Sequence, residues 1–327
     1  MTVVTSSNYW NVLFTEIQNE VEENGRMKYL LIEKKYKQAV ERAEERIRFF
    51  YGKNAVNNRI PLKLAYRKLD KEQLDQFYDL IEQYIKWWDK PIDHAEKVSL
   101  KDTTSESDVS EAYELNDTEA WITYLRECKN RDDITYFEAL SIPILNEVEK
   151  VSHDTANTLL ELLVITGWTV HSDIAKNLKI QELTQEQLKK ELLKSWASDG
   201  MSLTERFSRN KNMLTSSVKA SLIKGFRNEM TVDEVIADVS RTMGIGQNAA
   251  KRLVLTENTH FSTHSTYLAL KQAGYTHYRY MCRLLPTSCE DCIDLHNTVF
   301  PIEMYEVGVT ASPMHPHCLC YIIGEDN

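Results

Sequence analysis

Apolar residues in the N-terminal part of the chain recur at spacings of three and four. The first stripe shares this spacing and contains Tyr36, Val40, Ala43, Ile47 and Phe50. It predicts a long amphipathic helix that ends near Gly52. The second stripe follows a capping-box pair, Asp70 with Gln73, and ends before Pro91; it contains Leu74, Phe77, Ile81, Tyr84 and Trp88. We expect these two helices to pack against each other as a hairpin.

Residues 119–243 continue the helical pattern. Helices are expected over 120–128 and, after Pro143, over 144–168. The pairs Thr184 with Gln187 and Thr231 with Glu234 are capping-box patterns that predict two further helix starts; the first of these helices would include Trp196 and end at Gly200.

Gly244 and Gly246 predict a tight turn before a helix over 247–273. This arrangement fits a DNA-reading helix-turn-helix or an ordinary helical hairpin. After Gly274 the period changes to two, and Tyr278 and Tyr280 mark a strand, with further short strands expected over 298–302 and 320–323.

The predicted fold class is therefore mainly α. Long N-terminal helices occupy 1–100 and a helical middle region occupies 119–243. A small zinc-stabilised α+β domain occupies 244–327. Residues 101–118, rich in Ser, Thr, Asp and Glu, are expected to be an acidic linker between the first two regions.

Charge is distributed unevenly in this chain of 327 residues with a net charge of −10. Residues 201–283 hold twelve Lys/Arg and six Asp/Glu, whereas residues 284–327 hold seven acids and no Lys or Arg. The basic stretch fits non-specific contact with DNA, and it equally fits a plain solvated surface. We expect no export signal and no membrane span, because no apolar segment has the required length and position.

Four of the six cysteines gather near the C-terminal end in a pattern typical of metal ligation. Cys289 and Cys292 have a two-residue spacer, and the same spacer separates His315 from Cys318. Zinc takes four N or S ligands in a tetrahedron, so these four residues are the predicted ligands, with Cys320 or His317 as substitutes. Four protein ligands leave no open position, so the predicted zinc is structural. The alternative is a set of unligated thiols.

These residues also carry a family resemblance. The order is Arg252-Leu253-Val254-Leu255-Thr256-Glu257, Cys289 with Cys292, Thr298-Val299-Phe300, and His315-Pro316-His317-Cys318-Leu319-Cys320. It resembles the Mu F-type phage head morphogenesis (minor capsid) family. The sequence departs from the family pattern at Leu255, where Arg is usual, at Asn297, where Gly is common, at Ser312-Pro313 in place of a double proline, and at Leu319 in place of Arg.

The resemblance implies a low-copy, non-enzymatic virion component. Such a protein is made in the host bacterial cytoplasm and lies at the portal vertex or in the capsid interior. It assists head assembly and takes part in DNA packaging or ejection. The implied partners are the portal protein and capsid or scaffold proteins.

Three alternative functions and three residues of the helix over 247–273 complete the prediction. A zinc-supported HNH-like nuclease would use His296 and Asn297, and a DNA-binding protein without catalysis is the other alternative. A deaminase reading of the His94-Ala95-Glu96 triplet is disfavoured by its distance along the chain from Cys289. Glu257 is expected to fix its helix against the metal-bound tail, and His260 and His264 to lie on a polar helix face.

Overall fold

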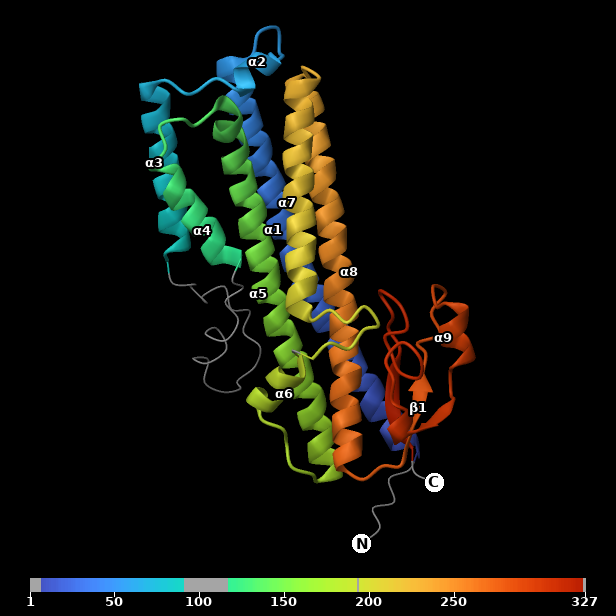
Figure 1. Ribbon diagram of the computed structural model, residues 1–327. Coiled ribbons are helices and arrows are strands. Elements are labelled where there is room, and N and C mark those ends of the chain that lie inside the picture. The colour runs from blue at the N-terminus through green and yellow to red at the C-terminus, as the bar shows by residue number, and fades with distance from the viewer. Residues whose placement is uncertain (1–6, 91–116, 193, 326–327) are drawn as a thin grey trace. The chain divides into compact units, whose positions relative to one another are not determined.

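A computed structural model of the chain describes residues 7–90, 117–192 and 194–325. Helices carry most of these residues, and a small antiparallel sheet lies near the C-terminal end (Figure 1). The predicted fold class, mainly α with a small C-terminal α+β region, is confirmed. The elements are α1 (Ser7–Asn54), α2 (Leu62–Ala65), α3 (Lys71–Trp88), α4 (Asp117–Cys128), α5 (Tyr136–Leu178), α6 (Gln185–Leu192), α7 (Leu203–Arg227), α8 (Val232–Gln272), β1 (His277–Met281), α9 (Glu290–Asp294), β2 (Val299–Pro301), η1 (Ile302–Met304) and β3 (Tyr321–Glu325).

The chain divides into two compact units, each assembled from separated segments. Unit 1 contains Met1–Glu33, Thr155–Phe207 and Gln247–Asn327, and unit 2 contains Lys34–Asp154 and Ser208–Gly246. Segments of α1, α5, α7 and α8 contribute to both units. Most of the predicted linker 101–118 lies outside the described residues; its last two positions begin α4.

In unit 2, the second apolar stripe packs against α4 rather than against the first helix. The capping box of α3 is confirmed, because Asp70 Oδ1 accepts a hydrogen bond from Gln73 N at 2.9 Å and Gln73 Oε1 accepts one from Asp70 N at 3.0 Å. The buried side chains around this stripe come from α3, α4 and the region leading into α5: Phe77, Ile81, Tyr84, Leu125, Cys128, Ile134 and Ile142. Among the described residues this cluster contains none from α1, so the predicted hairpin partner was wrong.

Several predicted helix ends differ from the structure. Gly52 lies inside α1, and α6 ends before Trp196. Pro143 lies within α5 instead of preceding it. A proline removes one intrahelical hydrogen bond, and the burial of Ile142 and Ile144 on either side, at 1% and 0% exposure, offsets this loss.

α8 is a single helix through the predicted glycine turn. Thr231 caps it as predicted, since its Oγ1 accepts from Glu234 N at 3.4 Å and its N donates to Glu234 Oε2 at 2.7 Å. Gly244 and Gly246 are helical, so the predicted tight turn, on which both the hairpin and the helix-turn-helix interpretations depend, was wrong, and the predicted boundary at 243/244 falls inside α8. The helix ends near Gly274, whose φ of +84° suits a glycine at a helix C-terminus.

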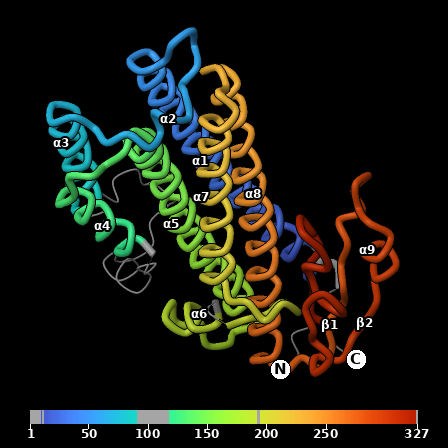
Figure 2. The backbone as a smooth tube through the Cα atoms, turned by 45° about the horizontal axis from the view of Figure 1, so that its top comes forward, coloured from blue at the N-terminus to red at the C-terminus, as the bar shows by residue number. Residues whose placement is uncertain are grey.

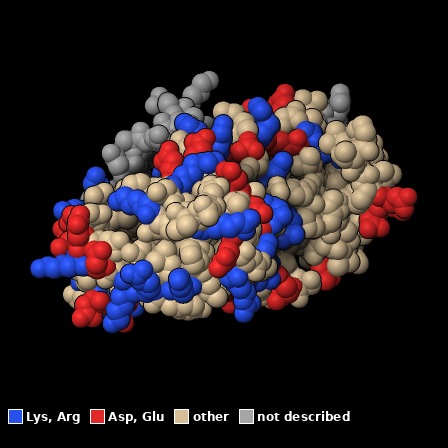
Figure 3. Space-filling model, turned by 90° about the horizontal axis from the view of Figure 1, so that it is seen from above, with Lys and Arg blue, Asp and Glu red and all other residues tan. Residues whose placement is uncertain are grey.

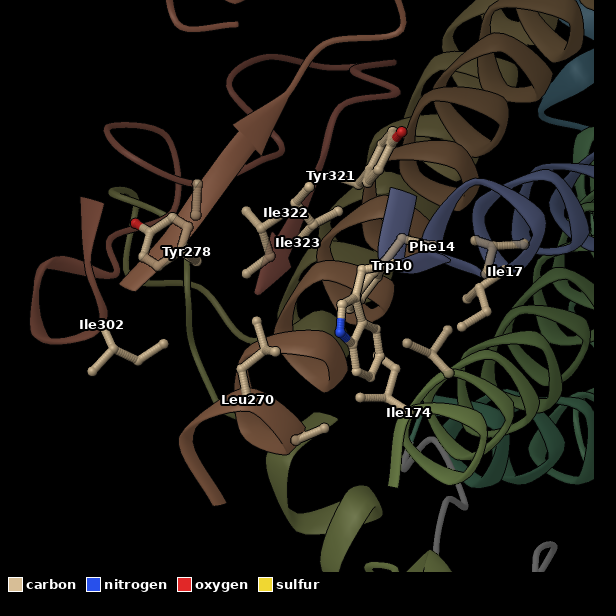
Figure 4. Close-up of a cluster of buried hydrophobic side chains, with 14 residues drawn as sticks. Trp10, Phe14, Ile17, Ile174, Leu270, Tyr278, Ile302, Tyr321, Ile322 and Ile323 are labelled. Atoms are coloured by element: carbon tan, nitrogen blue, oxygen red, sulfur yellow. The ribbon is translucent and has the colours of Figure 1, made fainter. Parts of the chain in front are cut away.

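The core of unit 1 joins α1, α5, α8 and the sheet (Figure 4). Its buried side chains include Trp10, Phe14 and Ile17 from α1, Ile174 from α5, Leu270 from α8 and Tyr321 to Ile323 from β3. The sheet has the order β2-β1-β3, with both neighbours antiparallel to β1. Figure 2 shows β1 and β2 next to each other. On β1, Tyr278 belongs to this core and Tyr280 to the adjacent cysteine cluster, so the strand ties one to the other.

Within the described ranges, no helix combines the length and the apolar character needed to cross a membrane.

Candidate metal centre

The first cysteine pair is placed by the short helix α9. Cys289 is the N-cap residue, with extended backbone angles, and its Sγ accepts a hydrogen bond from Cys292 N at 3.4 Å. The single helical turn brings Cys292 inward, where its side chain is 1% exposed. A two-residue spacer thus aims both sulfurs at one point, as the sequence predicted.

The second set of ligand atoms comes from the segment before β3. Cys318 N donates to His315 O at 3.1 Å, which closes a turn and brings the two side chains to the same side. His317 sits in this turn with a φ of +63°, a left-handed conformation, and it is exposed. The turn therefore separates His315 and Cys318 from His317.

Cys292 is the centre of the constellation. Its Sγ lies 3.6 Å from His315 Nε2 and 3.8 Å from Cys318 Sγ. In a tetrahedral zinc site with Zn–S near 2.3 Å and Zn–N near 2.0–2.1 Å, two sulfurs are about 3.8 Å apart and a sulfur and a nitrogen about 3.5 Å apart. Both separations match the edges of such a tetrahedron.

Two overlapping groups of ligand atoms share Cys292. One group is Cys289, Cys292 and His315, the other is Cys292, Cys318 and Cys320, and within each group the ligand atoms lie within 4.8 Å of one another. The four predicted ligands and the substitute Cys320 thus fall into two groups joined at Cys292, and the predicted set of four does not form a single group. Among the described residues, the substitute His317 belongs to neither group.

The buried sulfurs differ in charge state: of Cys292, Cys318 and Cys320, only Cys318 has a lowered pKa. Burial raises the pKa of the Cys292 thiol to about 12, and a hydrogen bond from Cys320 lowers the pKa of Cys318 to about 5. The same hydrogen bond, with burial, raises the pKa of Cys320. A divalent ion would offset the charge of further thiolates, because metal-bound thiols ionise readily.

The site is walled by β1 and by apolar side chains. Tyr280, fully buried on β1, donates a hydrogen bond from its hydroxyl to Cys292 Sγ at 3.4 Å. Cys282 is buried nearby, but its Sγ accepts from Leu284 N and it belongs to neither ligand group. Leu295, Phe300 and Met314 pack around the sulfurs.

A row of threonines on α8 holds the cysteine-rich tail, residues 312–320, and no pattern in the sequence predicted this contact. Thr256 Oγ1 accepts from His317 N at 3.2 Å, and the Thr259 hydroxyl donates to Cys318 O at 2.7 Å. One turn further on, the hydroxyls of Thr263 and Ser312 are 2.8 Å apart, and Ser312 in turn donates to Cys320 O at 2.6 Å. Spacings of three and four residues place these threonines on one helix face.

Glu257 has a different partner from the predicted one. Its side chain is buried and accepts hydrogen bonds from Arg206 Nη1 at 2.8 Å and Trp196 Nε1 at 2.9 Å. Burial raises the pKa of Glu257, and these two donors oppose that rise. The glutamate therefore fixes the segment around Trp196 to α8, while the threonines fix the tail.

His260 is buried and His264 is half-buried, rather than both lying on a polar face. The His260 ring stacks on Trp196 with centroids 4.3 Å apart, and His264 Nε2 lies 3.2 Å from Glu191 Oε2. Burial holds the pKa of His260 well below its usual value and also lowers that of His264. The polar-face prediction was wrong because the segment after α6 folds over this part of α8.

The two residues that a nuclease would use, His296 and Asn297, have structural roles. His296 Nδ1 accepts a hydrogen bond from Cys282 N at 3.1 Å, and Asn297 has a φ of +67°. His94 and Glu96, which the deaminase reading would require, lie outside the described residues.

Comparison of the chain with known protein families, with curated proteins and with solved structures finds no match.

Proposed function

We propose that the chain is a non-enzymatic minor capsid (head morphogenesis) protein of a phage or prophage. It would act as a low-copy virion component at the portal vertex or in the capsid interior. There it would assist head assembly and also DNA packaging or ejection. Its partners would be the portal protein and capsid or scaffold proteins, with non-specific DNA contact as a further interaction.

The contact between α8 and the cysteine-rich tail carries this proposal. The family resemblance rests on two separate stretches, residues 252–257 and 289–320. Thr256, within the first stretch, bonds to the backbone of His317 in the second, and Thr259 bonds to Cys318. The stretches that resemble the family therefore form one packed unit, as expected if they share a single role.

Asn297 supports the resemblance at a position where this chain departs from it. The family commonly has Gly there, and the residue adopts a φ of +67°. Left-handed backbone favours Gly, and Asn is among the residues that tolerate it best. The substitution thus preserves the backbone conformation.

The metal in this proposal is one structural zinc. Thiolate and imidazole ligands in tetrahedral spacing are typical of zinc, and a set of four protein ligands leaves no position for a substrate. Cys289, Cys292, His315 and Cys318 are the proposed ligands, and Cys320 would bond to Cys318 beside the ion. Zinc would join α9 to the segment before β3 and so fix the tail against α8.

Two measurements on the purified chain test the proposal. Elemental analysis should give about one zinc per chain. A column that carries the portal protein encoded beside this chain should retain the chain. An unrelated helical protein of similar charge should flow through the same column. Absence of portal binding would overturn the assembly role, and absence of zinc would overturn the metal site.

A plasmid assay separates the nuclease alternative. The zinc-loaded chain with magnesium or manganese is expected to leave supercoiled plasmid intact. Cleavage that disappears in His296→Ala would replace the structural role with a catalytic one.

A further inference from the structure

Residues 46–69 of unit 2 form a surface of net positive charge. This stretch contains no Asp or Glu and seven exposed cations: Arg46, Arg48, Lys53, Arg59, Lys63, Arg67 and Lys68. They lie on the end of α1, on α2 and on the adjoining turns, at the top of Figure 1. Figure 3, which looks down from above, shows many Lys and Arg side chains interspersed with uncharged surface and some acids. Acids of neighbouring elements border this surface: Asp233 pairs with Arg48 at 3.3 Å, Glu234 lies near Arg59, and Asp133 lies near Lys68.

The same surface exposes large apolar side chains. Phe49, Val56, Leu62 and Tyr66 are 60%, 67%, 37% and 75% exposed. The turn that presents Val56 is held in place, because Val56 and Arg59 exchange two backbone hydrogen bonds of 2.9 and 3.1 Å. Exposed apolar groups inside a charged rim are typical of protein interfaces.

Residues 284–309 of unit 1 form a surface of the opposite charge. It carries no Lys or Arg and five exposed acids: Glu290, Asp291, Asp294, Glu303 and Glu306. It also exposes Leu284, Leu285, Ile293, Met304 and Val309, each by between 43% and 54%. The preceding cations Arg279 and Arg283 are already paired, with Glu325 at 2.7 Å and Glu22 at 2.8 Å.

We propose that these two surfaces bind each other in different copies of the chain, the basic surface of one copy docking on the acidic surface of the next. Opposite charge would orient the copies, and the apolar side chains on both surfaces would be buried together. Because the two surfaces differ, the contact is head-to-tail and generates a ring or an open chain of copies. A nucleic acid would satisfy the cations of the basic surface but would leave Val56 and Leu62 in water, so a second copy fits the surface better. The association does not depend on the role in phage assembly.

Sedimentation velocity of the zinc-loaded full chain tests this association. At about 50 mM salt the sedimentation coefficient should rise with protein concentration, and at about 500 mM salt the association constant should fall by roughly tenfold or more, because salt screens the opposed charges. A wild-type chain that stays monomeric at both salt concentrations overturns the proposal.

Charge exchange makes the test specific. The basic-surface variant K63E/R67E/K68E and the acidic-surface variant D294K/E303K/E306K should each be monomeric alone. An equimolar mixture should associate again, because the intact acidic surface of the first variant then meets the intact basic surface of the second. Restored association in the mixture also shows that both variants are folded.

A matched control changes the same number of charges elsewhere. Lys34, Lys37 and Lys219 are exposed and lie outside both surfaces, so K34E/K37E/K219E should associate like the wild type. Loss of association in this control, or no recovery in the mixture, would contradict the proposal. So would a basic surface that binds a single-stranded oligonucleotide while the chain shows no self-association.

Discussion

At the scale of single residues, Cys292 separates the ligands from the other buried cysteines. Its sulfur is shared by both ligand groups, whereas the equally buried Cys282 belongs to neither. The two side chains have the same chemistry and lie in the same cluster. Position relative to His315 and Cys318 is therefore what makes Cys292, and not Cys282, a candidate ligand.

Replacing Cys292 with serine should abolish stoichiometric zinc binding, because a neutral hydroxyl does not substitute for a thiolate in this set. Cys282→Ser is the matched control and should retain about one zinc per chain. Elemental analysis after desalting measures both variants. Equal zinc content in the two would contradict the assigned ligand set.

The burial of His260 predicts how the free energy of unfolding depends on pH. Its imidazole is buried against Trp196, with His264 and Arg206 as the charged or titratable neighbours that lower its pKa. The unfolded chain takes up a proton near pH 6.5 while the folded chain does not, so this stabilisation is complete above that pH and is lost as the pH falls.

The test is urea unfolding of wild type and His260→Phe at about pH 7.5 and about pH 5.5. The variant should lose less free energy of unfolding on acidification, by up to about 1.4 kcal/mol per pH unit. Parallel losses in the two proteins would show that His260 is not the titrating group.

At the scale of elements, the helix that faces a helical glycine decides whether replacing that glycine with alanine stabilises or destabilises the fold. A Cβ at Gly167 on α5 would collide with the Phe261 ring of α8, whereas a Cβ at Gly244 on α8 would meet nothing within 4 Å. Both residues lie inside helices, where alanine is intrinsically favoured over glycine. The sign of a substitution therefore depends on the facing helix.

Gly167→Ala should lower the free energy of unfolding by about 1–3 kcal/mol, because the ring must shift within a packed core. Gly244→Ala should raise it by up to about 1 kcal/mol through helix propensity. Chemical denaturation of the two variants measures both changes. A stabilising Gly167→Ala would refute the close approach of α5 and α8.

The threonine row on α8 gives a second prediction for elements. Thr259→Val keeps the shape of the side chain and removes the hydrogen bond to Cys318 O. A hydrogen bond of this kind contributes about 1 kcal/mol, so zinc should pass to a chelator roughly fivefold faster. In Thr266→Val, the control on the same helix, only a bond to Ser262 O within α8 is lost, and the transfer rate should stay as in the wild type. Equal rates in the two variants would mean that α8 does not hold the metal-binding tail.

At the scale of the whole molecule, a metal ion in the candidate centre would stabilise only part of the fold. α9 and the segment before β3 contribute the candidate ligands, while the core of unit 1 also draws on α1, α5 and α8. That core buries large apolar side chains that do not contact the metal site, among them Trp10, Phe14 and Ile174.

Removal of zinc with a chelator should therefore unfold residues near 284–320 while most of the helical circular dichroism remains. Limited proteolysis, read by mass spectrometry, should place the first new cuts in that segment. Structural zinc contributes on the order of 10 kcal/mol in small zinc peptides, so the change should be large. A proportional loss of helical signal would contradict the separation of the metal centre from the helical core.

The sequence by itself determined the local features: the helical period, the capping boxes at Asp70, Thr184 and Thr231, the strand at Tyr278 and the metal-ligand spacing. Each depends on residues a few positions apart, which a short sequence window contains. Only the tertiary structure decided which helix α3 meets, that α8 continues through Gly244, that Glu257 holds Arg206, and that the threonines of α8 hold the tail. Those outcomes depend on burial against segments far along the chain, whose packing energy exceeds local propensity.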